Sequence, residues 1–227
     1  MIKFPDLHPF HEKIFKETVS DQKISTKVSR IRCFFEDWAG NFVHPFGDDL
    51  FEGNALTDNM FYSYLASQTV IFDWMGHSLF CGAYNIVFRE LRTILESVFT
   101  AYYLEITFKG MSLQDKIEEF KNLEHKGKTH GKKVFTRVGL NNWDEYYTLY
   151  RELCSYVHLS ASIGGKEIIQ VIQNGYGKLL DFEYHSDIFE KCYDIWMHIA
   201  QLSNHLAVHF LKRCKITKVQ TPTNYFG

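Results

Sequence analysis

Apolar residues in the middle of the chain are spaced as in an α-helix. Between residues 84 and 108 they recur every three or four positions, which places them along one face of a helix. The stripe consists of Val87, Leu91, Ile94, Leu95, Val98 and Tyr102. Lys109 and Gly110 follow it, and glycine after a helical stretch is a common stop signal. We therefore predict a long helix over residues 84–108.

Similar spacing and suitable N-cap residues predict four further helices. Thr57-Asp58 followed by Asn59, Ser112 and Ser186 each precede an apolar-periodic stretch, and their side chains can accept a hydrogen bond from its first backbone N–H groups. The predicted ranges are about 59–80, 113–123, 144–159 and 187–212. Residues 46–221 contain no proline, so nothing there forces a helix to break. The expected fold is all-α, a bundle of about four main helices.

Two segments lack this periodicity. Residues 124–142 are expected to form a loop. Residues 167–183 contain β-branched residues on both sides of Asn174-Gly175, which favours a small β-hairpin, although a short helix stopped by Gly175 fits nearly as well.

The expected organisation has three parts, since prolines are confined to the two ends of the chain. It consists of an N-terminal extension packed on the bundle (1–53), a helical domain (54–214) and a C-terminal tail (215–227).

Composition narrows the class of protein. With 227 residues, 45% hydrophobic and 23% charged, the chain can bury a substantial core. Its formal charge of −2 argues against a basic coat, so any contact with nucleic acid would need a local patch.

The stretch 59–88 has one formal charge but too many polar residues for a membrane span. The five cysteines are scattered without a Cys-x-x-Cys unit, as in reduced intracellular proteins, so we expect a cytoplasmic protein without membrane contact.

Arg151 and His158 are the residues most suggestive of chemistry. They lie seven residues apart on one predicted helix. Seven residues turn through about 700°, so the two side chains share a face. A permanent cation can hold a phosphate, and an imidazole can exchange protons near neutral pH. Together they predict phosphodiester chemistry, while a structural role, with Arg151 paired to Glu152 or Glu96 and His158 at a helix end, is the alternative.

The segment from Tyr150 to His158 resembles the signature of the HEPN superfamily of helical ribonucleases and nucleotide-binding domains, an arginine and a histidine separated by four to six residues. Glu152 stands where the family usually has Asn, Asp or His. The earlier segment 89–96, with an arginine followed by glutamates, is similar to a helix of abortive-infection HEPN proteins. The resemblance covers roughly residues 59–212.

This resemblance implies a metal-independent endoribonuclease that acts as a homodimer and needs no cofactor. Arg151 would hold the scissile phosphate and His158 would transfer the proton, with the two copies facing each other across a cleft. Such proteins serve as toxins or antiviral defence effectors, so an antitoxin or regulatory protein is a further expected partner beside the RNA substrate.

Other residues are predicted to support this site. Arg92 and Glu96 lie four residues apart, which fits either an intrahelical ion pair or a role for Glu96 in orienting the catalytic pair. Tyr150 and Glu152 flank Arg151. The predicted loop is rich in cations that could bind RNA phosphates, namely Lys126, Lys128, Lys132, Lys133 and Arg137.

Two other functions stay open on the sequence. His198, His205 and His209 fall within about 40° of one another on the last predicted helix, so a metal-dependent helical-bundle enzyme is conceivable. No Glu-x-x-His motif accompanies them, and polar packing or exposure is the simpler interpretation. The third reading is a non-catalytic helical module that binds a partner protein or a nucleotide.

Overall fold

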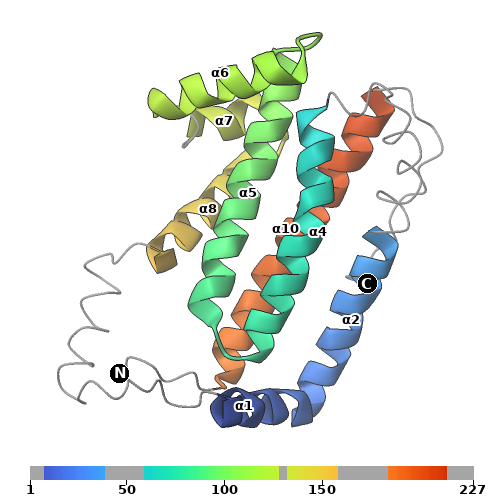
Figure 1. The fold of residues 1–227 in the computed structure, drawn as a ribbon, viewed down its shortest axis with the longest axis vertical. Coiled ribbons are helices and arrows are strands. Elements are labelled where there is room, and N and C mark those ends of the chain that lie inside the picture. The colour runs from blue at the N-terminus through green and yellow to red at the C-terminus, as the bar shows by residue number, and fades with distance from the viewer. Residues whose placement is uncertain (1–7, 39–58, 128–131, 158–183, 214–227) are drawn as a thin grey trace, which may run out of the picture.

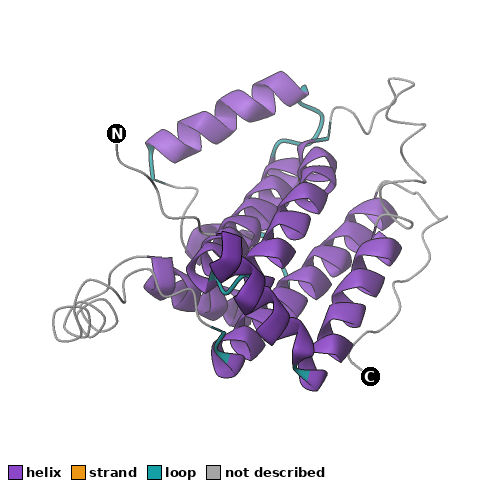
Figure 2. Ribbon diagram, turned by 60° about the horizontal axis from the view of Figure 1, so that its bottom comes forward, coloured by secondary structure: helices purple, strands orange, loops and turns teal. Residues whose placement is uncertain are grey.

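The computed structural model describes residues 8–38, 59–127, 132–157 and 184–213, and every regular element in these ranges is a helix (Figures 1 and 2). The helices are α1 (His8–Ser20), α2 (Gln22–Trp38), α4 (Met60–Phe80), α5 (Tyr84–Thr107), α6 (Leu113–His125), α7 (Lys132–Arg137), α8 (Trp143–Val157) and α10 (Ser186–Arg213). The all-α prediction is confirmed. The prediction of about four main helices is not, because the described part of the chain forms eight. The hairpin expected near 167–183 lies outside the described residues.

Helix α5 lies at the centre of the bundle, where it packs against α4, α8 and α10 (Figure 1). Its predicted apolar stripe is fully buried, from Val87 to Tyr102. A helix with neighbours on several sides buries more than one stripe, and Phe88, Phe99 and Tyr103 are buried as well. The elements that carry the candidate site are therefore built around this one helix.

Helices α4 and α10 run antiparallel beside α5. Phe72 stacks on Trp196 with ring centroids 6.0 Å apart, and Phe61 meets Phe210 edge-on at 5.4 Å. The earlier residue of α4 thus contacts the later residue of α10. Offset and edge-to-face ring pairs of this kind add to the stability that burial gives, by about 0.5–1.5 kcal/mol each.

Two predicted N-caps, Asn59 and Ser112, are found at the expected helix ends, whereas the predicted cap Ser186 is already the first residue of α10. The Asn59 side chain accepts a hydrogen bond from the Tyr62 backbone N–H at 2.9 Å at the start of α4. Ser112 accepts from the Asp115 N–H at 3.2 Å at the start of α6. Between α5 and α6, Gly110 adopts a φ of 90°, a left-handed conformation that residues with a Cβ rarely take.

The predicted loop 124–142 contains a helix, so that prediction was wrong in part. Helix α7 is only six residues long, too short to show apolar periodicity or to be stable alone. Val134 and Phe135 are buried, and the Phe135 ring lies 4.3 Å from that of Phe99 on α5. Packing of Phe135 against α5, rather than the local sequence, therefore stabilises α7.

The N-terminal helices α1 and α2 pack on the bundle. Phe34 of α2 is buried and meets Phe72 of α4 with ring centroids 6.0 Å apart. At the junction of α1 and α2, the Asp21 carboxylate accepts a hydrogen bond of 2.7 Å from the Tyr184 hydroxyl, just before α10. None of the described helices combines the length and the hydropathy that a bilayer-spanning segment needs.

Candidate functional site

Helix α8 carries the candidate site, and one of its faces is packed against the rest of the bundle. Tyr146, Tyr150 and Leu153 recur at helical spacing and are buried against α5 and α7. The Tyr150 ring lies 5.5 Å from Phe135, and the Tyr146 ring lies 5.8 Å from Phe99. Because one face of α8 is fixed in this way, the side chains on its other faces have defined directions.

Arg151 follows Tyr150 but points elsewhere, since successive helical residues are about 100° apart. Its side chain is exposed, and within the described ranges it forms no hydrogen bond or ion pair. The two carboxylates that the sequence offered as partners are engaged by other cations. Glu152 binds Lys191 of α10 at 2.7 Å, and Glu96 lies 3.6 Å from Arg92. Arg151 is therefore a cation available to a ligand.

His158, the other half of the predicted pair, lies outside the described residues, as does Lys128. Helix α8 is described as far as Val157. The distance between Arg151 and His158 thus remains a prediction from helical spacing.

Three residues predicted to support the site come together between α5 and α8. The Arg92 guanidinium lies over the Tyr150 ring, 5.7 Å from its centroid, and next to Glu96 one turn further along α5. Both charged side chains are largely buried. This arrangement matches the intrahelical ion pair, with Tyr150 added from the neighbouring helix, and it joins α8 to α5.

The protonation of this cluster follows from its surroundings. Burial raises the pKa of Tyr150, and the nearby Arg92 opposes that rise only in part, so the phenol stays neutral near neutral pH. Burial disfavours the charged form of Arg92, but hydrogen bonding to Tyr150 and the nearby Cys154 outweigh it and raise the pKa of Arg92. The cluster is a neutral phenol beside the Arg92–Glu96 ion pair, which suits a structural support.

A groove of about 500 Å³ lies between α8 and α10. Its lining comprises four carboxylates (Glu152, Asp187, Glu190 and Asp194), two basic side chains (Lys191 and His198) and two aliphatic ones (Leu149 and Ile195). The excess of carboxylates gives the groove a negative potential, which repels phosphates. A polyanion would therefore reach Arg151 from another side of α8.

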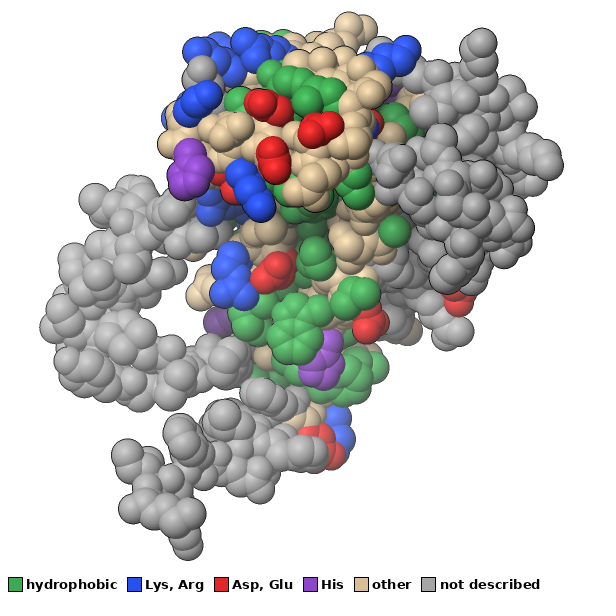
Figure 3. All heavy atoms as spheres, turned by 45° about the horizontal axis from the view of Figure 1, so that its top comes forward, with side chains coloured by type: hydrophobic (Ala, Val, Ile, Leu, Met, Phe, Trp, Pro, Cys, Tyr) green, Lys and Arg blue, Asp and Glu red, His purple; other side chains and the backbone are tan. Residues whose placement is uncertain are grey.

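At the end of the molecule that carries α6 and α7, Lys and Arg side chains lie along one edge with acidic side chains beside them (Figure 3). The described cations proposed for RNA binding belong to this part of the chain, since Lys126 directly follows α6 and the others lie in α7. Lys126 and Lys133 are exposed. Lys132 lies 5.3 Å from the centre of the Trp143 ring, and Arg137 donates a hydrogen bond of 2.7 Å to the Tyr103 hydroxyl. These two cations are therefore partly engaged by aromatic side chains of the protein.

The three histidines of α10 all lie on its exposed face, as their spacing predicted. His198 faces Glu145 of α8 at 3.6 Å, and His209 hydrogen-bonds through Nδ1 to the Tyr102 hydroxyl. His205 is exposed to solvent. Within the described ranges, no group of three or more His, Cys, Asp and Glu side chains is close enough together to hold a metal ion.

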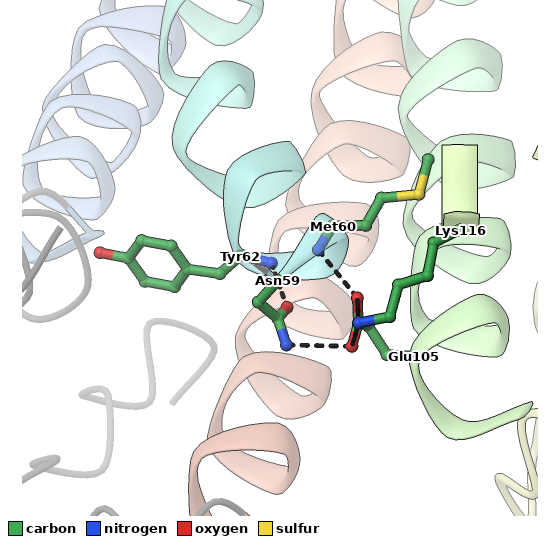
Figure 4. A network of polar contacts seen from close by, with 5 residues as sticks. All are labelled: Asn59, Met60, Tyr62, Glu105 and Lys116. Atoms are coloured by element: carbon green, nitrogen blue, oxygen red, sulfur yellow. Dashed lines mark hydrogen bonds and ion pairs between the residues drawn. The ribbon is translucent and has the colours of Figure 1, made fainter. Parts of the chain in front are cut away.

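A buried polar network that the sequence analysis missed lies where α4, α5 and α6 meet (Figure 4). Glu105 accepts hydrogen bonds from the Met60 backbone N–H at 2.8 Å and from Asn59 Nδ2 at 3.1 Å, and it pairs with Lys116 at 3.0 Å. Glu105 follows Val98 and Tyr102 at helical spacing, so a lone carboxylate in the apolar stripe was the available signal. Because its acceptors are all used within the protein, this network has a structural role.

Comparison with known proteins gives no relative from which a function could be transferred. Scans against protein-family models, curated proteins and solved structures found no significant match.

Proposed function

We propose that this protein is a metal-independent endoribonuclease in which Arg151 binds the scissile phosphate and His158 transfers the proton. The observation that carries the proposal is the state of Arg151, an exposed guanidinium without a described partner on a helix whose opposite face is locked in the core. An arginine that serves only stability would be expected to pair with Glu152 or Glu96, and both are bound to other cations.

The proposed reaction needs one cation and one group that exchanges protons. The His158 imidazole would accept the proton of the ribose 2′-hydroxyl, whose oxygen attacks the adjacent phosphorus. Arg151 would donate hydrogen bonds to the non-bridging oxygens as negative charge builds up on the phosphorane. Departure of the 5′-oxygen, which takes up a proton, leaves a 2′,3′-cyclic phosphate on one product and a 5′-hydroxyl on the other.

The charge distribution around α8 supports a direction for the substrate. Phosphates are repelled by the carboxylate-rich groove between α8 and α10 and attracted by the exposed cations Lys126 and Lys133 at the end with α6 and α7. RNA would therefore extend from Arg151 toward that end of the molecule.

The HEPN resemblance supports the rest of the proposal. It implies an HEPN-like arrangement of the helices and a homodimer in the cytoplasm. It also implies a role as a toxin or antiviral defence effector whose activity is inhibited by a regulatory protein such as an antitoxin.

The test is cleavage of single-stranded RNA in the presence of EDTA. We expect the wild-type protein to produce ends with cyclic phosphate, and Arg151→Ala and His158→Ala each to lower the rate by about 10²–10⁴-fold. Arg89→Ala is the matched control, because Arg89 is also an exposed helical arginine and is paired with Glu90 at 3.0 Å. It should cleave at the wild-type rate.

Three results would count against the proposal. Cleavage that survives Arg151→Ala would show that Arg151 is not needed for the reaction, and the proposal depends on that residue. If the wild-type protein cleaves no RNA at any concentration, the non-catalytic helical module becomes the better interpretation, and cleavage only after addition of a divalent metal would favour the metal-dependent enzyme.

A further inference from the structure

Helix α8 carries four tyrosines, which differ in what their hydroxyls contact. The hydroxyls of Tyr146, Tyr150 and Tyr156 are hydrogen-bonded to side chains around them. The Tyr147 hydroxyl has no hydrogen bond with a described residue, and the side chain is partly exposed. Tyr147 is therefore the tyrosine of α8 whose side chain is open to a ligand.

Two neighbouring rings hold the Tyr147 ring in place. The Phe135 ring of α7 meets it edge-on with centroids 5.5 Å apart, and the Tyr150 ring lies nearly parallel to it at 6.4 Å. A ring that is held in this way and still partly exposed loses little conformational entropy when another flat ring stacks on it.

Tyr147 lies one turn before Arg151 on α8, so their side chains are neighbours on the helix surface. It faces away from the carboxylate-rich groove, because Leu149 and Glu152 of that groove are turned about 140–160° from Tyr147. Among the carboxylates of α8, Asp144 is the nearest to Arg151 in direction, but it lies about 10 Å before Arg151 along the helix. A phosphate bound to Arg151 would therefore have an aromatic ring beside it.

A second cation follows at the next turn, where α8 begins at the end of the molecule with α6 and α7 (Figure 1). Trp143 lies four residues before Tyr147, and Lys132 Nζ is 5.3 Å from the centre of the Trp143 ring while the lysine stays exposed. Four residues of helix rise by about 6 Å, which is close to the distance between successive nucleotides in an extended strand. Arg151, Tyr147 and Lys132 thus form a row of cation, aromatic ring and cation.

We propose that Tyr147 stacks an unpaired base of the RNA next to the scissile phosphate, and that Lys132 binds the phosphate on the far side of that base. A base must leave a duplex before it can stack on a side chain, so the substrate is single-stranded at the cleavage site. Aromatic stacking accepts every base, so Tyr147 selects unpaired RNA rather than a sequence. The inference rests on the proposed function, which puts the scissile phosphate at Arg151.

Binding of a short single-stranded RNA with 2′-O-methyl groups tests the stacking without cleavage, because the attacking hydroxyls are blocked. In fluorescence anisotropy, Tyr147→Phe should bind like wild type, and Tyr147→Leu should raise the dissociation constant by about tenfold. Leucine keeps an apolar side chain against Phe135 but has no aromatic face. Tyr64→Leu is the matched control and should bind like wild type, because Tyr64 is also partly exposed and its hydroxyl has no hydrogen bond with a described residue.

The dependence on salt separates the two proposed contacts. Lys132→Gln should lower the slope of log Kd against log salt by about 0.7, the value for one phosphate of a single strand, and Tyr147→Leu should leave the slope unchanged. A duplex of the same sequence should bind equally to wild type and Tyr147→Leu. Equal affinity of Tyr147→Leu and Tyr147→Phe for the single strand, or an equal loss for the duplex, would overturn the stacking.

A second measurement uses the wild-type protein and holds even if Tyr147→Leu fails to fold, which circular dichroism would reveal. Single-stranded RNA with iodouridine in place of uridine should cross-link to Tyr147 on irradiation, as located by mass spectrometry. Cross-links only at other residues would overturn the proposal.

The RNA cleavage assay decides the nuclease proposal separately. A protein that cleaves RNA but binds it equally with Tyr147→Leu and Tyr147→Phe is a nuclease without this stacking contact. A protein that binds RNA through Tyr147 but does not cleave it loses only the nuclease proposal.

Discussion

Glu105 of α5 and Lys116 of α6 form an ion pair inside the protein, with Lys116 Nζ 3.0 Å from Glu105 Oε2 and both side chains only 6% exposed. The carboxylate also binds the first backbone N–H of α4, where the partial positive charge of the helix end favours an anion. Three helices are therefore joined through one carboxylate.

This pair predicts strong coupling between two substitutions. Glu105→Gln should lower the free energy of unfolding by about 3–5 kcal/mol, because it removes the carboxylate charge that pairs with the buried Lys116 ammonium. Lys116→Met should cost less than Glu105→Gln, since Asn59 and Met60 still donate to the carboxylate. Urea unfolding of the single and double variants measures the coupling. Additive effects would show that the two charges do not depend on each other.

Two arginines of the candidate site should differ in their effect on stability. Arg151→Ala removes an exposed side chain and should change the free energy of unfolding by less than about 0.5 kcal/mol. Arg92→Ala should cost about 1–3 kcal/mol, because it withdraws the cation from Glu96 and uncovers the Tyr150 ring. Thermal unfolding compares the two. A destabilised Arg151→Ala protein would assign that arginine a structural role and weaken the nuclease proposal.

The contact between Asp21 and Tyr184 should make stability depend on pH in the acid range. The Tyr184 hydroxyl, followed by the Lys23 backbone N–H, lowers the pKa of Asp21 below its usual 3.8. The stability from this lowering is present above pH 3.8, where the unfolded carboxyl is ionised, and is lost as pH falls through the lower folded-state pKa. Tyr184→Phe should therefore be less stable than wild type at pH 7, with a difference that shrinks below about pH 4.

Urea unfolding from pH 7 to about pH 2.5 checks this dependence on pH. Tyr64→Phe is the control, because the Tyr64 hydroxyl has no hydrogen bond with a described residue. Its difference from wild type should stay constant with pH. If the stability difference between Tyr184→Phe and wild type were also independent of pH, the contact between Asp21 and Tyr184 would not be the cause of the pH dependence.

Cys192 should resist alkylation in the folded protein. It is fully buried on α10, and burial raises the pKa of its thiol to about 12, so both access and thiolate are lacking at pH 8. Cys33 is exposed and should react at least about a hundredfold faster with iodoacetamide, as followed by mass spectrometry. Equal labelling of the two thiols in native buffer would mean that α10 separates from the bundle much more often than its packing suggests.

The sequence predicted individual helices well where the signal is local. The apolar stripe of α5 and the caps Asn59 and Ser112 gave helix ranges close to those observed, because a cap acts on the two or three residues that follow it. Helix α7 escaped prediction, since its stability comes from Phe135 packing on Phe99, far away in the sequence.

The sequence was sufficient to name candidate site residues, but it did not predict which ion pairs those residues form. Helical spacing places Arg92 beside Glu96, and the structure confirms that neighbour relationship. No local rule indicates that Glu152 binds Lys191 and thereby leaves Arg151 without its nearest carboxylate. The acidic groove between α8 and α10 likewise arises from residues that are about 40 positions apart in the chain.

The sequence by itself thus determined that the chain is helical and where most helices begin and end, because backbone hydrogen bonds and caps in a helix join residues within four positions. The tertiary structure alone decided which charges neutralise each other, and that Glu105 and Lys116 are sealed inside while Arg151 is exposed. Coulomb interactions and burial depend on distances in space between residues remote in sequence, and only the packing of the helices fixes those distances.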